Sequence, residues 1–142
     1  MTTPAKGAAR SGRLRPRITL AADEHERLSA LANAAMNTMP EVAGYLADEL
    51  DRAQVLVNGR QPTEAVRMGC EVEFRDDATG KTQTVTLVYP GEADISQGKI
   101  SVLTPIGAAL IGVHVGQAIS WETRGGELKR LTVLHVREPQ PA

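Results

Sequence analysis

The segment that most constrains the fold is residues 99–112, with the sequence KISVLTPIGAALIG. Ile100 and Val102 alternate with a serine, which is the pattern of a strand with one buried face. Thr104 is a residue type that caps helices. Pro105 suits a first helical position, because the N–H that proline lacks would have no partner there. The segment therefore predicts a strand that turns sharply into a helix.

The helix predicted after this turn is short and apolar. Ile106, Ala109 and Leu110 fall on one face at helical spacing, and Gly112 is suited to end the helix. A small helix of this kind fits inside the concave face of a curved sheet. The turn that precedes it is then displayed at the rim.

The composition limits the class of protein. The 142 residues suffice for one ordinary domain or two very small ones, and with 3% aromatic residues the core must be mostly aliphatic. No apolar run has the length of a membrane span, and no apolar stretch follows the basic N-terminus as in a signal peptide. The single Cys70 excludes an internal disulfide. We expect a cytoplasmic protein without a membrane partner.

The charge is unevenly distributed, although the formal net charge is only −1. Residues 1–17 hold five basic side chains, no acidic one and few apolar ones, which predicts a disordered basic tail. The tail could contact nucleic acid or an acidic protein surface. A role in solubility alone is the simpler interpretation. Residues 138–142 predict a frayed C-terminus.

Residues 18–60 predict a short antiparallel helical hairpin, with the first helix beginning near Ala22. Thr38 and Glu41 have the spacing of a capping box, in which Thr38 caps the second helix and Glu41 reaches back to it. The apolar stripe of this helix continues to about Val55. At about 1.5 Å per residue, helices of about 15 residues make a hairpin only roughly 22 Å long.

After a turn at residues 58–62, residues 61–137 change to an alternating pattern that predicts strands. The expected strands lie near residues 72–74, 82–89, 100–102, 119–123 and 128–136. Gly125 and Gly126 predict a two-residue hairpin turn between the last two strands. Together with the apolar helix, this half predicts an α+β domain with a mostly antiparallel sheet curled around one short helix.

No set of side chains predicts a cofactor or a metal site. The glycines of this half fit no phosphate-binding loop, and no catalytic serine motif is present. The three histidines also do not have the spacing of metal ligands: His25, His114 and His135.

Two further positions have simple structural interpretations. Cys70 precedes a strand without a helix N-terminus or a basic neighbour to activate it, so it is predicted to be a packing residue. Asp76 and Asp77 could hold a cation, but turn chemistry before Gly80 explains them more simply.

Residues 100–112, followed by Val115 and Gly116, resemble the C-terminal domain of the bacterial transcript-cleavage factors GreA and GreB. The resemblance is closer still to one branch of that family, the regulator of nucleoside diphosphate kinase, Rnk. Three further segments carry it, residues 15–16, 49–54 and 86–90. The resemblance implies a short N-terminal coiled-coil hairpin followed by an FKBP-like domain.

In this family the C-terminal domain docks at the rim of the RNA polymerase secondary channel, and the hairpin points toward the channel. The resemblance therefore implies polymerase-binding residues at the strand-to-helix turn, namely Leu103, Thr104, Pro105 and Ile106. Cleavage factors usually have an acidic residue where this chain has Leu103. The implied partner is core RNA polymerase, with DNA contacted only through the polymerase, and we expect a monomer.

The predicted hairpin tip departs further from the cleavage factors. Two tip carboxylates in those factors help hold a second magnesium ion at the polymerase active site, where two metals clamp the reacting oxygens. Here the tip residues Asn37, Thr38, Met39 and Glu41 offer one acid. The prediction is a transcription regulator that is not an enzyme. It binds at the channel rim and competes there with cleavage factors.

Two other functions stay open at this point. An active transcript-cleavage or elongation factor would depend on Glu41. An FKBP-like prolyl isomerase or interaction module with another partner would need convergent aromatic walls, and this half of the chain holds only Phe74, Tyr89 and Trp121. The name of the Rnk branch suggests an effect on nucleoside diphosphate kinase, but no residue argues for direct contact with a kinase.

Overall fold

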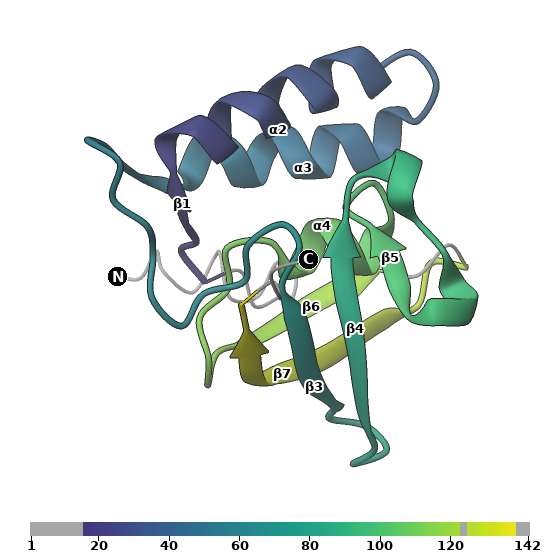
Figure 1. Cartoon of the computed structure of the whole chain (residues 1–142). Helices are drawn as coiled ribbons and strands as arrows, with labels where there is room; N and C mark the ends of the chain where they lie inside the picture. The colour runs from purple at the N-terminus through teal and green to yellow at the C-terminus, as the bar shows by residue number, and fades with distance from the viewer. Residues whose placement is uncertain (1–15, 123–124, 139–142) are drawn as a thin grey trace, which may run out of the picture.

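The computed structural model describes residues 16–122 and 125–138, in which a helical hairpin lies over a five-stranded sheet (Figure 1). A short helix, α4 (Pro105–Leu110), lies between the two layers and contacts both of them. The predicted α+β class, with a sheet around one short helix, is confirmed. The FKBP-like and coiled-coil details of that prediction stay predictions.

The hairpin consists of α2 (Ala22–Ala35) and α3 (Pro40–Arg52), which pack against each other. α2 begins at the predicted residue, and helical spacing places its buried residues on one face: Leu28, Ala32 and Ala35. The acidic residues in its first turn favour the helix dipole.

The predicted capping box at the start of α3 is wrong. The N-cap residue is Met39, and its side chain makes no cap hydrogen bond. The Thr38 hydroxyl instead donates to the carbonyl oxygen of Ala35, at 3.4 Å, in the turn that follows α2. Pro40 explains the shift, because it takes the first helical position and places the cap one residue after Thr38. Glu41 is then the second helical residue, one position short of capping-box spacing.

The second helix also ends earlier than predicted, at Arg52 rather than near Val55. The next residues form β2 (Gln54–Leu56), which pairs in parallel with β1 (Thr19–Ala21). The chain therefore enters and leaves the hairpin through two neighbouring, hydrogen-bonded strands.

The large sheet has the strand order β5-β4-β3-β7-β6. Its strands are β3 (Glu71–Asp76), β4 (Thr82–Val88), β5 (Lys99–Ser101), β6 (Ala118–Glu122) and β7 (Leu128–Arg137). Every neighbouring pair is antiparallel except β4 and β5, so the prediction of a mostly antiparallel sheet is confirmed. Two 3-10 turns connect β4 to β5, η1 (Pro90–Glu92) and η2 (Ile95–Gln97).

The predicted two-residue turn at Gly125 and Gly126 is wrong. Glu122, the last residue of β6, pairs with Leu128, the first residue of β7, so the two strands do not close directly on the two glycines. Gly126 has a φ of 87°, which explains why glycine occurs there even though the loop is longer than a tight turn.

One hydrophobic core joins the hairpin to the sheet. Its members come from both layers, since Leu28 and Leu46 of the hairpin belong to the same buried cluster as Val72 and Leu110. Leu20, just before α2, is also fully buried.

The N-terminal segment passes close to Gly112, directly after α4. Its carbonyl oxygen accepts a hydrogen bond from Thr19 N at 3.2 Å, and its own N–H donates to Val66 O at 2.8 Å. Gly112 has a φ of 77°, and a Cβ at this position would lie 2.6 Å from the Cβ of Ile18. Glycine is therefore needed both for the backbone turn and for the close passage of the N-terminal segment.

Candidate functional site

The turn from β5 into α4, residues 101–107, is here called the rim turn. The Thr104 hydroxyl donates to Ser101 O at 2.7 Å and accepts from Gly107 N at 3.1 Å, so it ties the end of the strand to the first turn of the helix. The Ser101 hydroxyl oxygen in turn accepts from Leu103 N at 2.9 Å. The prediction that Thr104 caps this helix and that Pro105 begins it is confirmed.

Gly107 makes the rim turn compact. A Cβ at this position would overlap the carbonyl oxygen of Ser101 and would lie 2.9 Å from the Thr104 hydroxyl. The missing side chain lets α4 begin directly against the end of β5, so hydrogen bonds and close packing both hold the turn.

The predicted polymerase-binding residues of the rim turn differ in exposure. Leu103 is only 6% exposed and belongs to the hydrophobic core, whereas Thr104, Pro105 and Ile106 are half-buried. Three of the four side chains therefore reach the surface. The burial of Leu103 gives a structural reason for an apolar residue where the cleavage factors usually have an acid.

The hairpin tip, residues 36–41, lies at the end of the hairpin away from β1 (Figure 1). The predicted tip residues Asn37, Thr38, Met39 and Glu41 are all exposed, and Met36 is 39% exposed. Among the described residues, no hydrogen bond or ion pair joins the tip to the rim turn. The structure thus presents two separate candidate surfaces.

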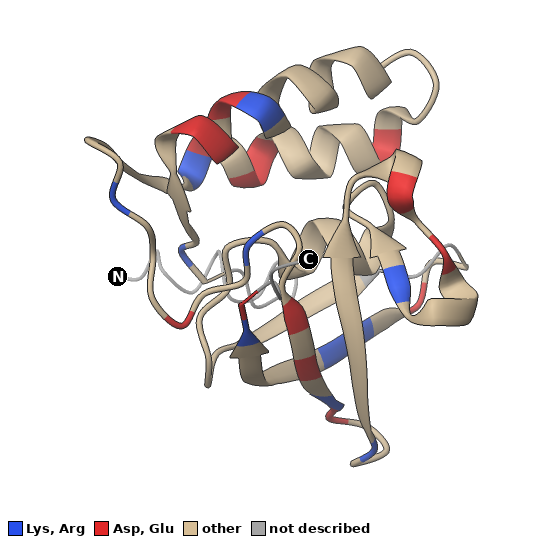
Figure 2. Cartoon of the chain, in the orientation of Figure 1, with Lys and Arg blue, Asp and Glu red and all other residues tan. Residues whose placement is uncertain are grey.

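Apart from Glu41, the charged side chains of the hairpin lie at its base. Between residues 28 and 47, Glu41 is the only charged side chain. The charged residues of the base occupy the first turns of α2 and the last turns of α3: Asp23, Glu24, Glu26, Arg27, Asp48, Glu49, Asp51 and Arg52. Figure 2 shows this division, since both helices are almost free of red and blue toward the tip.

A buried carboxylate fixes the base of the hairpin to the rest of the fold. Glu24 Oε2 accepts a hydrogen bond from Met68 N at 3.1 Å, and Oε1 is buried without a partner among the described residues. Burial raises the pKa of the Glu24 carboxyl above its ordinary value, and the Met68 N–H opposes this rise. The sequence interpretation missed this contact. The sequence does contain a signal for it. Residue 24 lies on the same helical face as the apolar residue Leu28, so the Glu24 side chain could be expected to point toward the core.

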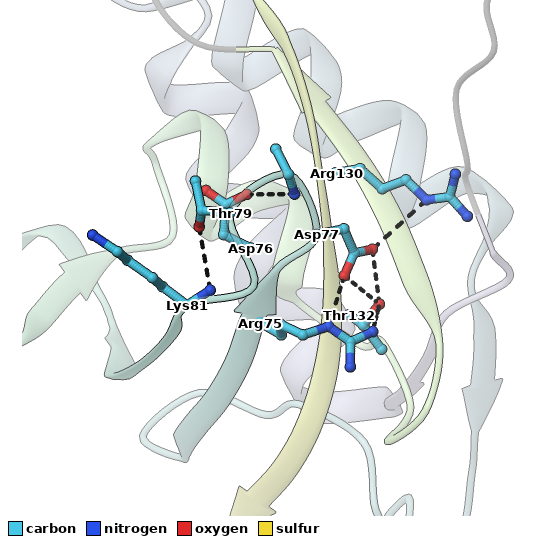
Figure 3. A network of polar contacts seen from close by, with 8 residues as sticks. Arg75, Asp76, Asp77, Thr79, Lys81, Arg130 and Thr132 are labelled. Atoms are coloured by element: carbon cyan, nitrogen blue, oxygen red, sulfur yellow. Dashed lines mark hydrogen bonds and ion pairs between the residues drawn. The ribbon is translucent and has the colours of Figure 1, made fainter.

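The interpretation of Cys70 agrees with the structure, and that of the aspartate turn agrees for Asp76 but not for Asp77, whose carboxylate pairs with Arg75 and Arg130. Cys70 is fully buried, and burial raises the pKa of its thiol, so it packs as predicted. The Asp76 carboxylate accepts from Ala78 N at 2.9 Å, and Gly80 has a φ of 78°, as turn chemistry requires (Figure 3). Within the described residues, no group of three or more histidine, cysteine, aspartate or glutamate side chains could hold a metal ion.

Comparisons with known proteins agree with the arrangement of hairpin, α4 and sheet. The model of the C-terminal part of the transcription elongation factors GreA/GreB matches residues 61–138, and the model of the Rnk N-terminus matches residues 16–56. A solved structure, the prokaryotic transcription elongation factor GreA/GreB from Nitrosomonas europaea, superimposes with a TM-score of 0.67 at 34% identity. The superposition covers 86% of this chain and 98% of the solved chain. The chain therefore belongs to the GreA/GreB family.

Within that family the similarity extends to the Rnk branch. The regulator of nucleoside diphosphate kinase of Escherichia coli K12 is 38% identical over 127 residues, which is 89% of this chain and 93% of that protein. The transcription elongation factor GreA of Chloroflexus aggregans is 40% identical over 88 residues, but this covers only 55% of its length. These relatives support a transcription-associated regulator. None of the described helices is both long and apolar enough to cross a membrane.

Proposed function

We propose that this protein regulates transcription without catalysis, by binding RNA polymerase at the rim of the secondary channel and competing there with cleavage factors. The observation that carries the proposal is the hairpin tip. Glu41 is the only acid between residues 28 and 47, and α2 and α3 have 14 and 13 residues. A two-metal mechanism of phosphodiester cleavage needs ligands for the second ion, and one carboxylate on a short hairpin is a poor site for it.

The rim turn supports the docking part of the proposal. Its backbone is held by the two hydrogen bonds of the Thr104 hydroxyl, so Thr104, Pro105 and Ile106 are presented in a fixed geometry. A preorganised surface loses little conformational entropy on binding. In this proposal Leu103 acts from within the core, where it shapes the turn.

The remaining parts of the proposal follow from the family. The protein acts as a cytoplasmic monomer and is not itself an enzyme. Its partner is core RNA polymerase, and DNA is reached only through the polymerase. The hairpin has the character of a short coiled coil, and the C-terminal part is FKBP-like.

The decisive measurement is equilibrium binding of labelled protein to core RNA polymerase, with and without a saturating cleavage factor. We expect saturable binding that the cleavage factor displaces. Ile106→Asp in the rim turn is expected to weaken this binding at least about tenfold. The matched control is Val57→Asp, at a 54% exposed position after β2, which is expected to bind normally. Absence of binding by the folded protein, or binding that the cleavage factor leaves unchanged, would contradict the proposal.

The second candidate function is active transcript cleavage, which one observation favours. Glu41 is exposed and is not engaged in the capping box that the sequence predicts, so its carboxylate faces solvent at the tip. Stalled transcription complexes test this directly. We expect no transcript shortening by the parent protein. Shortening that disappears in Glu41→Gln would establish the alternative instead.

A further inference from the structure

The turn between β3 and β4 points away from the hairpin (Figure 1), and basic side chains lie beside it. The turn between β3 and β4 and the beginning of β7 border an open hollow of about 680 Å³. Its charged lining consists of Arg75, Asp77, Glu127, Lys129 and Arg130. This hollow has no part in the rim turn or in the hairpin tip.

Asp77 pairs with both arginines of the hollow. Its Oδ1 accepts from Arg75 Nε at 3.0 Å, and its Oδ2 lies 3.7 Å from Arg130 Nε (Figure 3). The Thr132 hydroxyl donates to the same carboxylate, at 3.0 and 3.1 Å to its two oxygens. The carboxylate is 21% exposed, so these contacts are partly shielded from water. The Arg75 guanidinium group is thus oriented before any ligand arrives, whereas Arg130, which is 61% exposed, is attracted to the carboxylate without a hydrogen bond to it.

The geometry leaves donors available in the hollow. Both arginines face Asp77 with their Nε edge, and Arg75 also donates from Nη2 to the Thr132 hydroxyl at 3.4 Å. The Nη groups of Arg130 have no hydrogen bond or ion pair to any described residue, and neither does the ammonium group of Lys129. The lining carries three positive side chains, Arg75, Lys129 and Arg130, against the two carboxylates of Asp77 and Glu127, so one positive charge is in excess.

We propose that this hollow binds a phosphate group. Guanidinium forks match the oxygens of a phosphate, and a nearby ammonium adds a point charge. Leu128, which is 45% exposed at the edge of the hollow, offers apolar contact to whatever carries the phosphate. The phosphate belongs either to a nucleic-acid strand or to a small free compound. The proposal stands independently of polymerase binding, because the hollow is separate from both proposed docking surfaces.

The test follows the Nε–H signals of Arg75 and Arg130 by nuclear magnetic resonance. The full chain is titrated with inorganic pyrophosphate in one series and with an eight-nucleotide uridine RNA in another, at constant ionic strength. We expect saturable shifts of both signals, as direct ligands of a phosphate would show.

Variants test whether the side chains of the hollow bind the phosphate. Lys129→Gln and Arg130→Gln are each expected to weaken binding about tenfold, the usual loss for one charge-assisted contact. Asp77 keeps Arg75 and Thr132 as partners in both variants, so the turn should stay folded. The matched control is Arg137→Gln. This residue pairs with Glu71 at 2.9 Å at the other end of β7 and should leave binding within about twofold.

Either ligand series can support the site, and their comparison identifies the source of the phosphate. Tighter binding of the RNA than of pyrophosphate indicates a nucleic-acid strand, whereas similar affinities indicate a small phosphate compound. The proposal is overturned if neither ligand gives a saturable shift. It is also overturned if Lys129→Gln and Arg130→Gln bind like the parent.

Discussion

The rim turn and the hairpin tip are both short reversals of the chain, but they are stabilised to very different degrees. In the rim turn, the Thr104 hydroxyl makes two hydrogen bonds, Gly107 permits direct contact with the strand, and Leu103 is anchored in the core. At the tip, Met39 makes no side-chain cap, and the Thr38 hydroxyl makes one long hydrogen bond.

This difference indicates which of the two surfaces has a fixed shape. A turn held by interlocking contacts presents the same shape to every partner, and changes to it should cost folding stability. An exposed tip with few side-chain contacts can change sequence at little cost to the fold. We therefore expect substitutions to separate the two regions clearly.

The largest expected effect is that of Gly107→Ala. The added Cβ would overlap the Ser101 carbonyl oxygen, and because this is backbone, no rotamer change relieves the contact. We expect a loss of about 4 kcal/mol in the free energy of unfolding, measured by urea denaturation. The matched control is Gly44→Ala in α3, where a Cβ meets nothing within 4 Å. It should stabilise the protein by about 0.5–1 kcal/mol, through helix propensity. Stabilisation by both variants would show that the rim turn accepts a Cβ as readily as an open helix position does.

Leu103→Asp restores the kind of residue that cleavage factors usually have at this position. Because Leu103 is 6% exposed and packs in the core, a carboxylate here would lose its hydration. We expect a loss of about 3 kcal/mol in the free energy of unfolding. Leu103→Met, which keeps most of the volume, should cost less than about 1.5 kcal/mol. A stable, folded Leu103→Asp protein would mean that the rim turn adapts more easily than its contacts indicate.

The two threonines provide the sharpest comparison. Thr104→Ala removes a cap that both donates and accepts, so it should destabilise the protein by about 1–2 kcal/mol. Thr38→Ala removes one long hydrogen bond at an exposed position and should cost less than about 0.5 kcal/mol. Thermal unfolding of both variants against the parent measures this difference. Equal losses would show that Thr38 caps α3 after all.

The smallest expected effect concerns the base of the hairpin and depends on pH. Since burial raises the folded-state pKa of Glu24, the native protein binds that proton more tightly than the unfolded chain. Its contribution to stability therefore decreases as pH rises from the ordinary value of 4.5 through the raised pKa. Glu24→Gln should gain stability relative to the parent as pH increases over this window. Unfolding at several pH values checks it, with Glu26→Gln at an exposed position of α2 as the control for losing one charge. The opposite trend would show that the hydrogen bond from Met68 dominates.

The rim turn could be predicted from the sequence because its determinants are local. Thr104, Pro105 and the apolar residues after them specify a capped helix within one short segment, and the structure has this helix. The start of α3 was predicted wrongly, because two local signals compete there. The Thr38–Glu41 spacing favours one cap, but the fixed φ of Pro40 sets the first helical residue, and the proline prevails.

Other features depend on contacts between distant parts of the chain. Thr19 precedes the hairpin in the chain and Gln54 follows it. Nothing in the sequence near either residue indicates that the two pair. The hollow beside Asp77 is similar, because Arg75 and Arg130 come together only through the register of β3 with β7. The sequence contains both arginines, but it does not indicate that they lie close together. The burial of Leu103 likewise follows from the packing of the sheet and α4 rather than from the rim motif itself.

The parallel pairing of β1 with β2 also bears on how such proteins can evolve. The chain enters the hairpin at Thr19–Ala21 and leaves it at Gln54–Leu56, side by side. The hairpin is therefore an insertion whose two ends are fixed to each other. Equal additions to both helices would extend its reach by about 1.5 Å per residue, and neither the ends nor the core beneath would need to change. Hairpin length and tip chemistry can thus diverge between relatives while the rim turn stays the same.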